Sequence, residues 1–161
     1  MLGGLLVLTA VGLTLWTSRP GQPGGDSGGR ILHALQPASH AVPAGSTDVA
    51  TLRSDSGWSP ACPDNPGGQA GWSAVRVDTR FTTALPKKQV VHAVNSFLVG
   101  EGWARHDESF GPGQGVVAHW TKRLATGNPA EAAVYPVPAA GSTNWLLTAT
   151  SKPPGFALPG C

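Results

Sequence analysis

Residues 72–82, with the sequence WSAVRVDTRFT, decide the fold of this 161-residue chain. Polar and apolar side chains alternate along this stretch, and a period of two is typical of a β-strand with one buried face. One set of side chains is expected to face the core and the other the solvent: Val75, Val77, Thr79 and Phe81 in the first set, and Arg76, Asp78 and Arg80 in the second. The sequence therefore predicts a half-buried strand around which the other elements can be placed.

The strongest helical pattern follows this strand directly. Its apolar residues recur at helical spacing and form one stripe, made of Val90, Val91, Val94, Phe97 and Leu98. Thr83 can cap the first turn, and Pro86 suits that turn because its missing N–H would lack a helical partner there in any case. Gly100 or Gly102 can end the helix, since glycine readily adopts the left-handed conformation found at helix C-termini.

Five further strands are predicted from alternation and from the turns between them, at residues 48–53, 103–110, 116–124, 132–137 and 143–151. The last four form two consecutive pairs, and short connections favour antiparallel pairing. One helix is too little to cover both faces of a parallel sheet. We therefore predict an α+β fold, a two-layer sandwich with one main helix packed on a mostly antiparallel sheet. Pro136 and Pro138 are expected to confine their strand to an edge of that sheet.

The composition limits the classes of function. Glycine (22) and proline (15) make up nearly a quarter of the chain, whereas charged residues make up only 12%. The formal net charge of +2 excludes a nucleic-acid binder driven by a basic surface, and it also excludes an acidic disordered chain. Hydrophobic residues reach 40%, which is enough for one core, and the length predicts a single folded domain.

Residues 1–18 are strongly apolar and carry no charged side chain. As a helix they would be ~27 Å long, close to the ~30 Å thickness of the hydrocarbon core of a bilayer. We predict a single transmembrane signal anchor, with Trp16 at the membrane interface. A cleaved signal peptide and a buried core helix are the alternatives, although Thr14, Leu15 and Trp16 offer no cleavage site with small residues.

The remaining chain divides into a linker at residues 19–42 and a domain at residues 43–161. Seven of the eleven residues from 19 to 29 are glycine or proline, which is typical of a flexible spacer. A short amphipathic helix is predicted within the linker at residues 30–40, where a few apolar residues gather on one side.

The spacer contains the string Gly25-Asp26-Ser27-Gly28-Gly29, which matches the surroundings of the nucleophilic serine in chymotrypsin-like proteases. In those enzymes the serine follows two barrels that supply the base and its orienting carboxylate. Only 26 residues precede the serine here, and the nearest histidines follow it in an unrelated setting. We therefore interpret the string as part of the linker and predict no catalytic residue in it.

Cys62 and Cys161 are the two cysteines of the chain, and we predict a disulfide between them; two free thiols are the alternative. Such a bond would close a loop of about 100 residues and stabilise the fold by up to ~4.7 kcal/mol in the chain-entropy model. Disulfides persist in oxidising compartments, so this pairing supports an extracytoplasmic domain. Neither Cys-x-x-Cys nor a His–Cys cluster occurs, so no metal site and no cofactor are predicted.

A set of tryptophan- and cysteine-containing motifs resembles small exported proteins of high-GC actinobacteria. The motifs are Trp58-x-x-x-Cys62, Gly71-Trp72, Gly102-Trp103, Trp120-Thr121-Lys122, Trp145 and the terminal Cys161. The resemblance covers roughly residues 31–161. It implies one N-terminal membrane segment, a short linker and a compact α+β domain, and it implies no functional residues.

Three basic residues are candidate ligand contacts: Arg76, Arg80 and Lys122. Beside Asp78 they would form a small cationic patch able to bind an anionic component of a cell envelope, and an ordinary solvated sheet face is the alternative. The five tryptophans of the domain are expected to pack in the core. A face of exposed tryptophans for stacking on sugars is the alternative to that packing.

These observations together predict a non-enzymatic binding or scaffolding module, anchored in the cell membrane by one pass and facing the extracytoplasmic side. The first alternative is an envelope hydrolase or modifying enzyme in which His106 or His119 joins a carboxylate in a pocket. The second is an accessory subunit of a membrane protein complex. The expected partners are the membrane, an envelope component or a membrane protein, and not nucleic acid.

Overall fold

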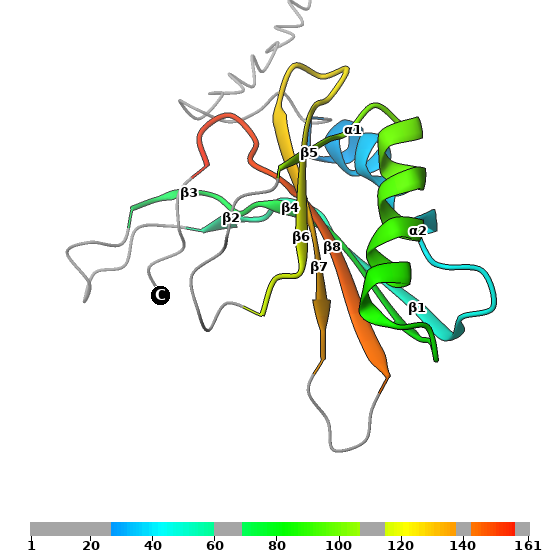
Figure 1. Cartoon of the computed structure of the whole chain (residues 1–161). Coiled ribbons are helices and arrows are strands. Elements are labelled where there is room, and N and C mark those ends of the chain that lie inside the picture. Colours follow the sequence, from blue (N-terminus) through cyan, green and yellow to red (C-terminus); the bar gives the residue numbers. More distant parts are fainter. Residues whose placement is uncertain (1–26, 60–68, 107–114, 138–142, 157–161) are drawn as a thin grey trace, which may run out of the picture.

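The computed structural model describes residues 27–59, 69–106, 115–137 and 143–156. Its main element is a six-stranded sheet, antiparallel throughout, with the strand order β1-β4-β8-β7-β6-β5 (Figure 1). The bounds of these strands, in the same order, are Thr47–Ser54, Val75–Thr82, Asn144–Ser151, Pro129–Pro136, Ala118–Arg123 and Ala104–His106. Strands β2 (Trp58–Ser59) and β3 (Gly71–Trp72) form a separate antiparallel pair.

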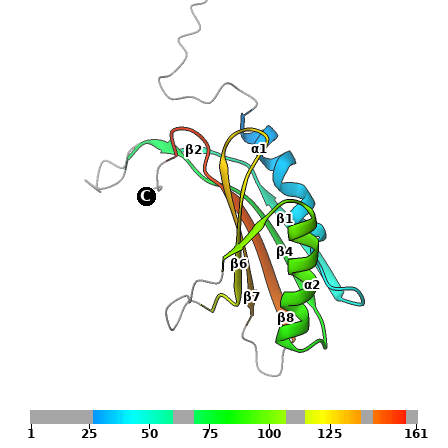
Figure 2. The same ribbon diagram turned by 45° about the horizontal axis from the view of Figure 1, so that its top comes forward.

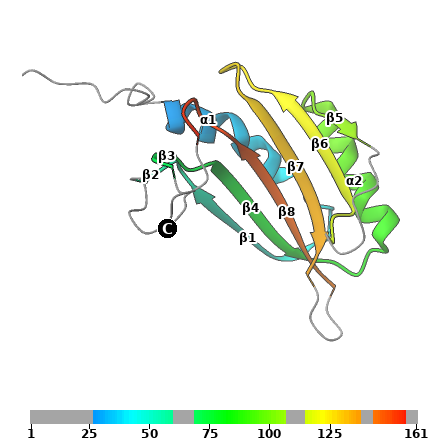
Figure 3. The ribbon, with the colours of Figure 1, turned by 90° about the vertical axis from the view of Figure 1, so that its left-hand side faces the viewer.

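The predicted fold class, a two-layer sandwich with one main helix, preceded in the sequence by a transmembrane helix, is wrong. The described chain is mostly antiparallel sheet with two α-helices, α1 (Ser27–Leu35) and α2 (Lys87–Gly100), and the 3-10 helix η1 (Gln36–His40) continues α1. Figures 2 and 3 show that both α-helices lie on one face of the large sheet. Among the described residues no helix is long and apolar enough to cross a membrane, and residues 1–18 lie outside them.

Helix α1 belongs to the folded core, whereas the prediction placed a short helix of residues 30–40 within the linker. Ile31 and Leu35 lie four residues apart on one face of this helix, and they are only 1% and 0% exposed in the core. Burying two such side chains contributes ~1.5–3 kcal/mol each, which outweighs ~1 kcal/mol for each helical glycine. The folded unit therefore includes residues that a glycine- and proline-rich composition assigns to a linker.

The first turn of α1 contains the last three residues of the GDSGG string, Ser27, Gly28 and Gly29. A Cβ atom at Gly28 would lie 2.4 Å from Asp55 Oδ1 and 2.5 Å from Ser56 Oγ. The segment after β1 therefore approaches this turn so closely that only glycine fits without a shift. Gly28 therefore has a packing role, and Ser27 begins a helix.

The strand and the helix predicted from residues 72–100 are confirmed, except that the strand begins at Val75 and Trp72 belongs to β3. Along β4 the side chains of Val75, Val77, Thr79 and Phe81 are buried, and the residues between them are exposed or half-buried. Helix α2 buries Val90, Val91, Val94 and Leu98. Its N-cap is Pro86, without a side-chain cap, and the Thr83 hydroxyl instead accepts a hydrogen bond from the Leu85 N–H at 3.3 Å.

Strand β7 is central, so the prediction that its prolines confine it to an edge is wrong. Pro129 and Pro136 are the first and last residues of the strand, which pairs with β8 on one side and β6 on the other. The ladder with β6 begins at Val134, so Pro136 lies beyond it and its missing N–H removes no bond to β6. Pro138 lies outside the described residues.

Most of the tryptophans pack as predicted. Trp103, Trp120 and Trp145 belong to the core, and Trp120 Nε1 donates to Asn95 Oδ1 at 3.1 Å, which joins β6 to α2. Trp58 and Trp72 differ, since they face each other across the β2–β3 pair with ring centroids 5.4 Å apart, and Trp58 is exposed.

Candidate functional site

The face of the large sheet opposite the helices, which we call the open face, is turned toward the viewer in Figure 3. The strand registers place its side chains in rows that cross the sheet. The first row is Thr121, Glu131, Thr150, Arg76 and Ser54; the second is His106, His119, Ala133, Thr148, Asp78 and Leu52; the third is Tyr135, Leu146, Arg80 and Ala50. The open face therefore gathers most of the polar candidates of the sequence.

Arg76 lies on this face, but its charge is already balanced. Arg76 Nε lies 2.7 Å from Asp78 Oδ1 and 3.2 Å from Thr148 Oγ1, and the Thr148 hydroxyl in turn donates to Asp78 Oδ1. The guanidinium is half exposed, so the pair is worth little in stability, about 0–1 kcal/mol. What the pair does is remove one of the three predicted cations from the set available to an anionic ligand.

Lys122 lies on the other face of the sheet. It has the same parity in β6 as Trp120, which contacts α2, so its side chain is directed toward the helix side. Lys122 Nζ donates to the Glu101 carbonyl oxygen at 2.5 Å and lies 5.9 Å from the centroid of the Trp103 ring. The structure therefore does not bring Lys122 together with Arg76 and Arg80.

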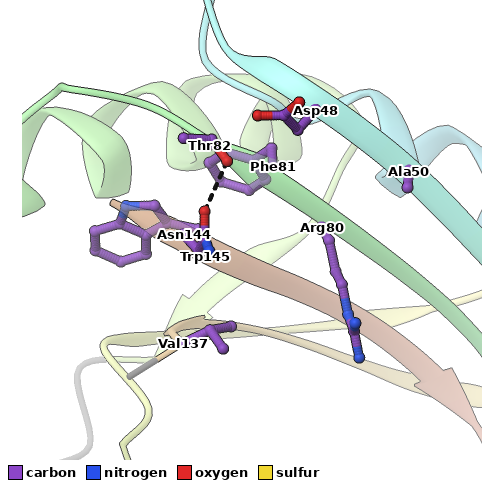
Figure 4. A pocket seen from close by; sticks show the side chains of 8 residues that line it. All are labelled: Asp48, Ala50, Arg80, Phe81, Thr82, Val137, Asn144 and Trp145. Carbon is purple, nitrogen blue, oxygen red and sulfur yellow. Dashed lines mark hydrogen bonds between the residues drawn. The ribbon is translucent and has the colours of Figure 1, made fainter. Parts of the chain in front are cut away.

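Arg80 lines a hollow at the end of the sheet, which we call the end hollow (Figure 4). The hollow has a volume of about 310 Å³ and lies where β1 and β8 begin and β4 ends. Its lining residues are Asp48, Ala50, Arg80, Phe81, Thr82, Val137, Asn144 and Trp145. Arg80 makes no ion pair within the part of the chain that the structure describes.

The walls of the end hollow combine apolar surface with a few fixed polar groups. Phe81 and Arg80 are neighbours on β4 and point to opposite sides of the strand in Figure 4. Thr82 Oγ1 donates to Asn144 Oδ1 at 2.7 Å, drawn as the dashed line in Figure 4. Because the Asn144 carbonyl oxygen accepts this bond, its amide nitrogen is the group that can donate to a ligand.

Asp48 supplies the opposite charge at the same hollow. It has a positive φ of 51° in β1, at a bulge where the pairing with β4 shifts register. Figure 4 shows Asp48 and Arg80 on different sides of the hollow. This arrangement can hold a small molecule that carries an anionic group for the guanidinium, an apolar body, and a hydrogen-bond donor for the carboxylate.

A second, smaller depression lies at the middle of the open face, and we call it the central hollow. Its volume is about 170 Å³, and its floor includes the small side chain of Ala133. His119, Glu131 and Tyr135 line it together with threonine hydroxyls of β8. Sequence analysis did not identify Glu131 and Tyr135 as candidates. The signal in the sequence is Ala133, which lies between them on the same face of β7 and whose small side chain leaves room for a depression.

Tyr135 is the residue at the central hollow whose acidity is altered. Burial raises the pKa of its phenol above the ordinary value, and the nearby carboxylates of Asp78 and Glu131 raise it further, while Arg76 opposes them. The phenol is therefore neutral near pH 7 and available as a hydrogen-bond donor.

The two histidines of the enzyme alternative lie side by side. His106 and His119 are directly paired across β5 and β6, with ring centroids 5.9 Å apart, and His106 Nε2 shares a hydrogen bond of 2.7 Å with Thr121 Oγ1. His119 lines the central hollow with Glu131, so one histidine and one carboxylate do share a depression. Asp107 and Glu108, the carboxylates that follow His106 in the sequence, lie outside the described residues.

The predicted disulfide between Cys62 and Cys161 also lies outside the described residues, so it stays a prediction. Within the described ranges, no group of three or more His, Cys, Asp and Glu side chains could hold a metal ion. The chain has no significant match among models of protein families, curated proteins or solved structures. The resemblance to exported actinobacterial proteins is therefore not tested by any relative.

Proposed function

We propose that this protein is a binding module that holds a small amphiphilic anion in the end hollow. The observation that carries the proposal is the contrast between two arginines on one strand face. Arg76 is paired with Asp78, whereas Arg80 lines an apolar-walled hollow and has no ion pair among the described residues. A guanidinium in that setting is suited to a carboxylate or a phosphate, to which it can donate two parallel hydrogen bonds.

The size of the hollow favours a small ligand. Pockets for small molecules commonly occupy ~300–1,000 Å³, and the end hollow of about 310 Å³ lies at the lower limit of that range. The central hollow, at about 170 Å³, lies below that range. Val137 and Ala50, which line the end hollow and keep exposed surface, would contact the apolar part of the ligand.

The cellular setting of the proposal comes from the sequence. The apolar segment of residues 1–18 would tether the module to a membrane, and an oxidised Cys62–Cys161 pair would place it on the extracytoplasmic side. In that setting an anionic constituent of the cell envelope, such as a lipid-derived or wall-derived acid, supplies the required chemistry. The proposed role is to bind such a molecule and not to convert it.

The experiment compares ligands and arginines in matched pairs. The full-length chain, kept in solution with a non-ionic detergent, is titrated with hexanoate, acetate and hexylammonium, and binding is followed by calorimetry and by the thermal midpoint. We expect hexanoate to bind and raise the midpoint, acetate to bind more weakly, and hexylammonium to bind no better than acetate. Arg80→Gln should lower hexanoate affinity about tenfold or more, because a charge-assisted hydrogen bond is worth ~1.5–3 kcal/mol.

Arg76→Gln is the matched control, since it removes the same charge from the same strand face two rows away. Its hexanoate affinity should stay within about twofold of wild type. An equal loss in both variants would show that only the overall charge matters, and no binding of hexanoate by the wild type would reject the end hollow as an anion site.

A second candidate function is hydrolysis, and it is favoured by the presence of His119 and Glu131 in the central hollow. A histidine and a carboxylate in one depression can serve as general base and orienting group. The test is hydrolysis of p-nitrophenyl acetate by wild type and by His119→Gln. A rate that exceeds that of free imidazole and falls in the variant would favour the enzyme over the binding module.

A further inference from the structure

Strand β1 is an edge strand whose residues are all exposed. It pairs only with β4 in the large sheet, so its outer N–H and C=O groups face away from the sheet. Figure 3 shows β1 as the outermost strand on its side. Two of the exposed large apolar side chains of the described chain belong to it, Val49 at 53% and Leu52 at 70% exposure. A long edge with exposed apolar side chains is a surface suited to pairing with another strand.

The bulge in β1 restricts where such pairing can occur. The register with β4 shifts between Thr47 and Ala50, and Asp48 in that interval has a positive φ of 51°. From Ala50 to Ser54 the pairing is regular, with one residue opposite one. The flat part of the edge is therefore a segment of five residues, and Leu52 is its central residue.

We propose that this edge is the interface with a second copy of the chain, in which β1 of one copy pairs antiparallel with β1 of the other about a two-fold axis at Leu52. A two-fold axis perpendicular to the sheet places the same face of both copies on one side, so the two six-stranded sheets would continue into one. The occupant is a second copy because the five-residue segment is complementary to itself.

The self-complementarity follows from the sequence of the segment, Ala50-Thr51-Leu52-Arg53-Ser54. With Leu52 on the axis, the two copies of Leu52 face each other and form an apolar pair on the open face. Arg53 then lies opposite Thr51, and Ser54 opposite Ala50. No like charges are directly opposed. The central pair is apolar, and in each of the other pairs a larger side chain lies opposite a smaller one.

A register centred elsewhere is less favourable. Centring the axis on Thr51 would place Arg53 opposite Val49, which lies in the irregular part of the strand next to the bulge. The ladder would break at that pair, and the exposed Leu52 would face only Ala50. The bulge therefore acts as a register mark, because it leaves one symmetric segment with an apolar centre.

The proposed pairing stands independently of the proposed ligand. It does affect the same region, because Asp48 and Ala50 of β1 line the end hollow. In the pair of chains, the end of β1 that carries Ser54 in one copy would lie beside the end hollow of the other. Each hollow would then have a wall that a single copy does not supply.

The experiment is co-capture of two differently tagged copies of the full chain, co-expressed and extracted in a mild detergent. Wild type should be recovered through either tag. Leu52→Glu and Leu52→Lys should each lower co-capture about tenfold or more, because like charges would meet on the axis. Co-expression of Leu52→Glu with Leu52→Lys should restore co-capture, since opposite charges then face each other across the axis.

Val99→Glu is the control for a general effect of adding a charge. Val99 is a similarly exposed apolar residue on α2, away from β1, so co-capture should be unchanged. Circular dichroism of each variant checks that the fold is retained, which the exposure of Leu52 favours. Failure of wild-type copies to co-capture, or co-capture that is insensitive to both charges at Leu52, would overturn the proposal. The proposal would also be overturned if both single variants lost co-capture and their co-expression did not restore it, because the loss would then not come from pairing of the two Leu52 side chains.

Discussion

The two faces of the large sheet differ in how their side chains are used. On the face covered by α1 and α2, β4 presents Val75, Val77, Thr79 and Phe81 with almost no exposed surface. On the open face the same strand presents Arg76, Asp78 and Arg80, of which only the first two form an ion pair among the described residues. Because its side chains alternate, one strand contributes to two different surfaces: the covered face is buried and supports stability, and the open face carries Arg80, the residue of the proposed binding site.

The largest expected effect tests whether stability resides on the covered face. Leu35→Ala removes a fully buried side chain of α1 and should lower the free energy of unfolding by about 2–5 kcal/mol, measured by urea denaturation. The control is Val99→Ala, which shortens an apolar side chain of α2 that is 49% exposed and should lower stability by less than ~0.5 kcal/mol. Similar losses in both variants would contradict the division between the faces.

A smaller effect tests the packing at the first turn of α1. Gly28→Ala places a Cβ 2.4 Å from Asp55 Oδ1 and 2.5 Å from Ser56 Oγ, so these two side chains must move and the variant should be less stable than Gly29→Ala by about 1 kcal/mol. The neighbouring Gly29→Ala meets no atom within 4 Å and should stabilise the helix by up to ~1 kcal/mol. The difference between the two variants is the result to look for in thermal or urea unfolding; equal stabilisation by both substitutions would show that the first turn of α1 does not contact the segment after β1.

The open face offers a comparison of smaller magnitude. Asp78→Asn removes the partner of Arg76 and should cost no more than about 1 kcal/mol of stability, because the pair is substantially exposed. It should also free the Arg76 guanidinium, so the variant should bind hexanoate at least as well as wild type does. A loss of several kcal/mol would mean that the open face contributes to stability as the covered face does.

The smallest expected effect concerns pH. Because the pKa of Tyr135 is raised in the folded state, the unfolded chain releases this proton first as pH increases, and the folded state loses stability above about pH 10. Below that pH the tyrosine contributes no pH dependence. Tyr135→Phe should therefore show a shallower loss of stability than wild type above about pH 10, measured by urea midpoints in a pH series. Parallel curves would contradict the shift.

Local patterns in the sequence were sufficient for many of the elements but not for their surroundings. The alternation in residues 75–82 and the helical stripe ending at Leu98 correspond to β4 and α2. Pro136 was misread because its effect depends on how far the neighbouring ladder extends. The sequence predicts a short helix at residues 30–40 but places it in the linker, because glycine and proline dominate the composition there, whereas in the structure Ile31 and Leu35 pack in the core.

The candidate site shows the same limit. Arg76, Arg80 and Lys122 were grouped because all three are basic and lie in strands, yet Lys122 belongs to the opposite face. The partner of Arg76 could be guessed from its i+2 spacing to Asp78, since residues two apart share a strand face. The walls of the end hollow could not, because they come from segments as far apart as β1 and β8.

The sequence by itself determined where the chain alternates, where it can form the helix α2 and which side chains of β4 are buried, because these properties depend on residues a few positions apart. Only the tertiary structure decided that α1 belongs to the core, that β7 is central, and that Arg80 rather than Arg76 or Lys122 lines a hollow without an ion pair among the described residues. The physical reason is that these properties depend on which strands are neighbours in the sheet. Val75, for example, pairs with Ser151, and pairing between residues so far apart in the sequence is set by the burial of the whole core.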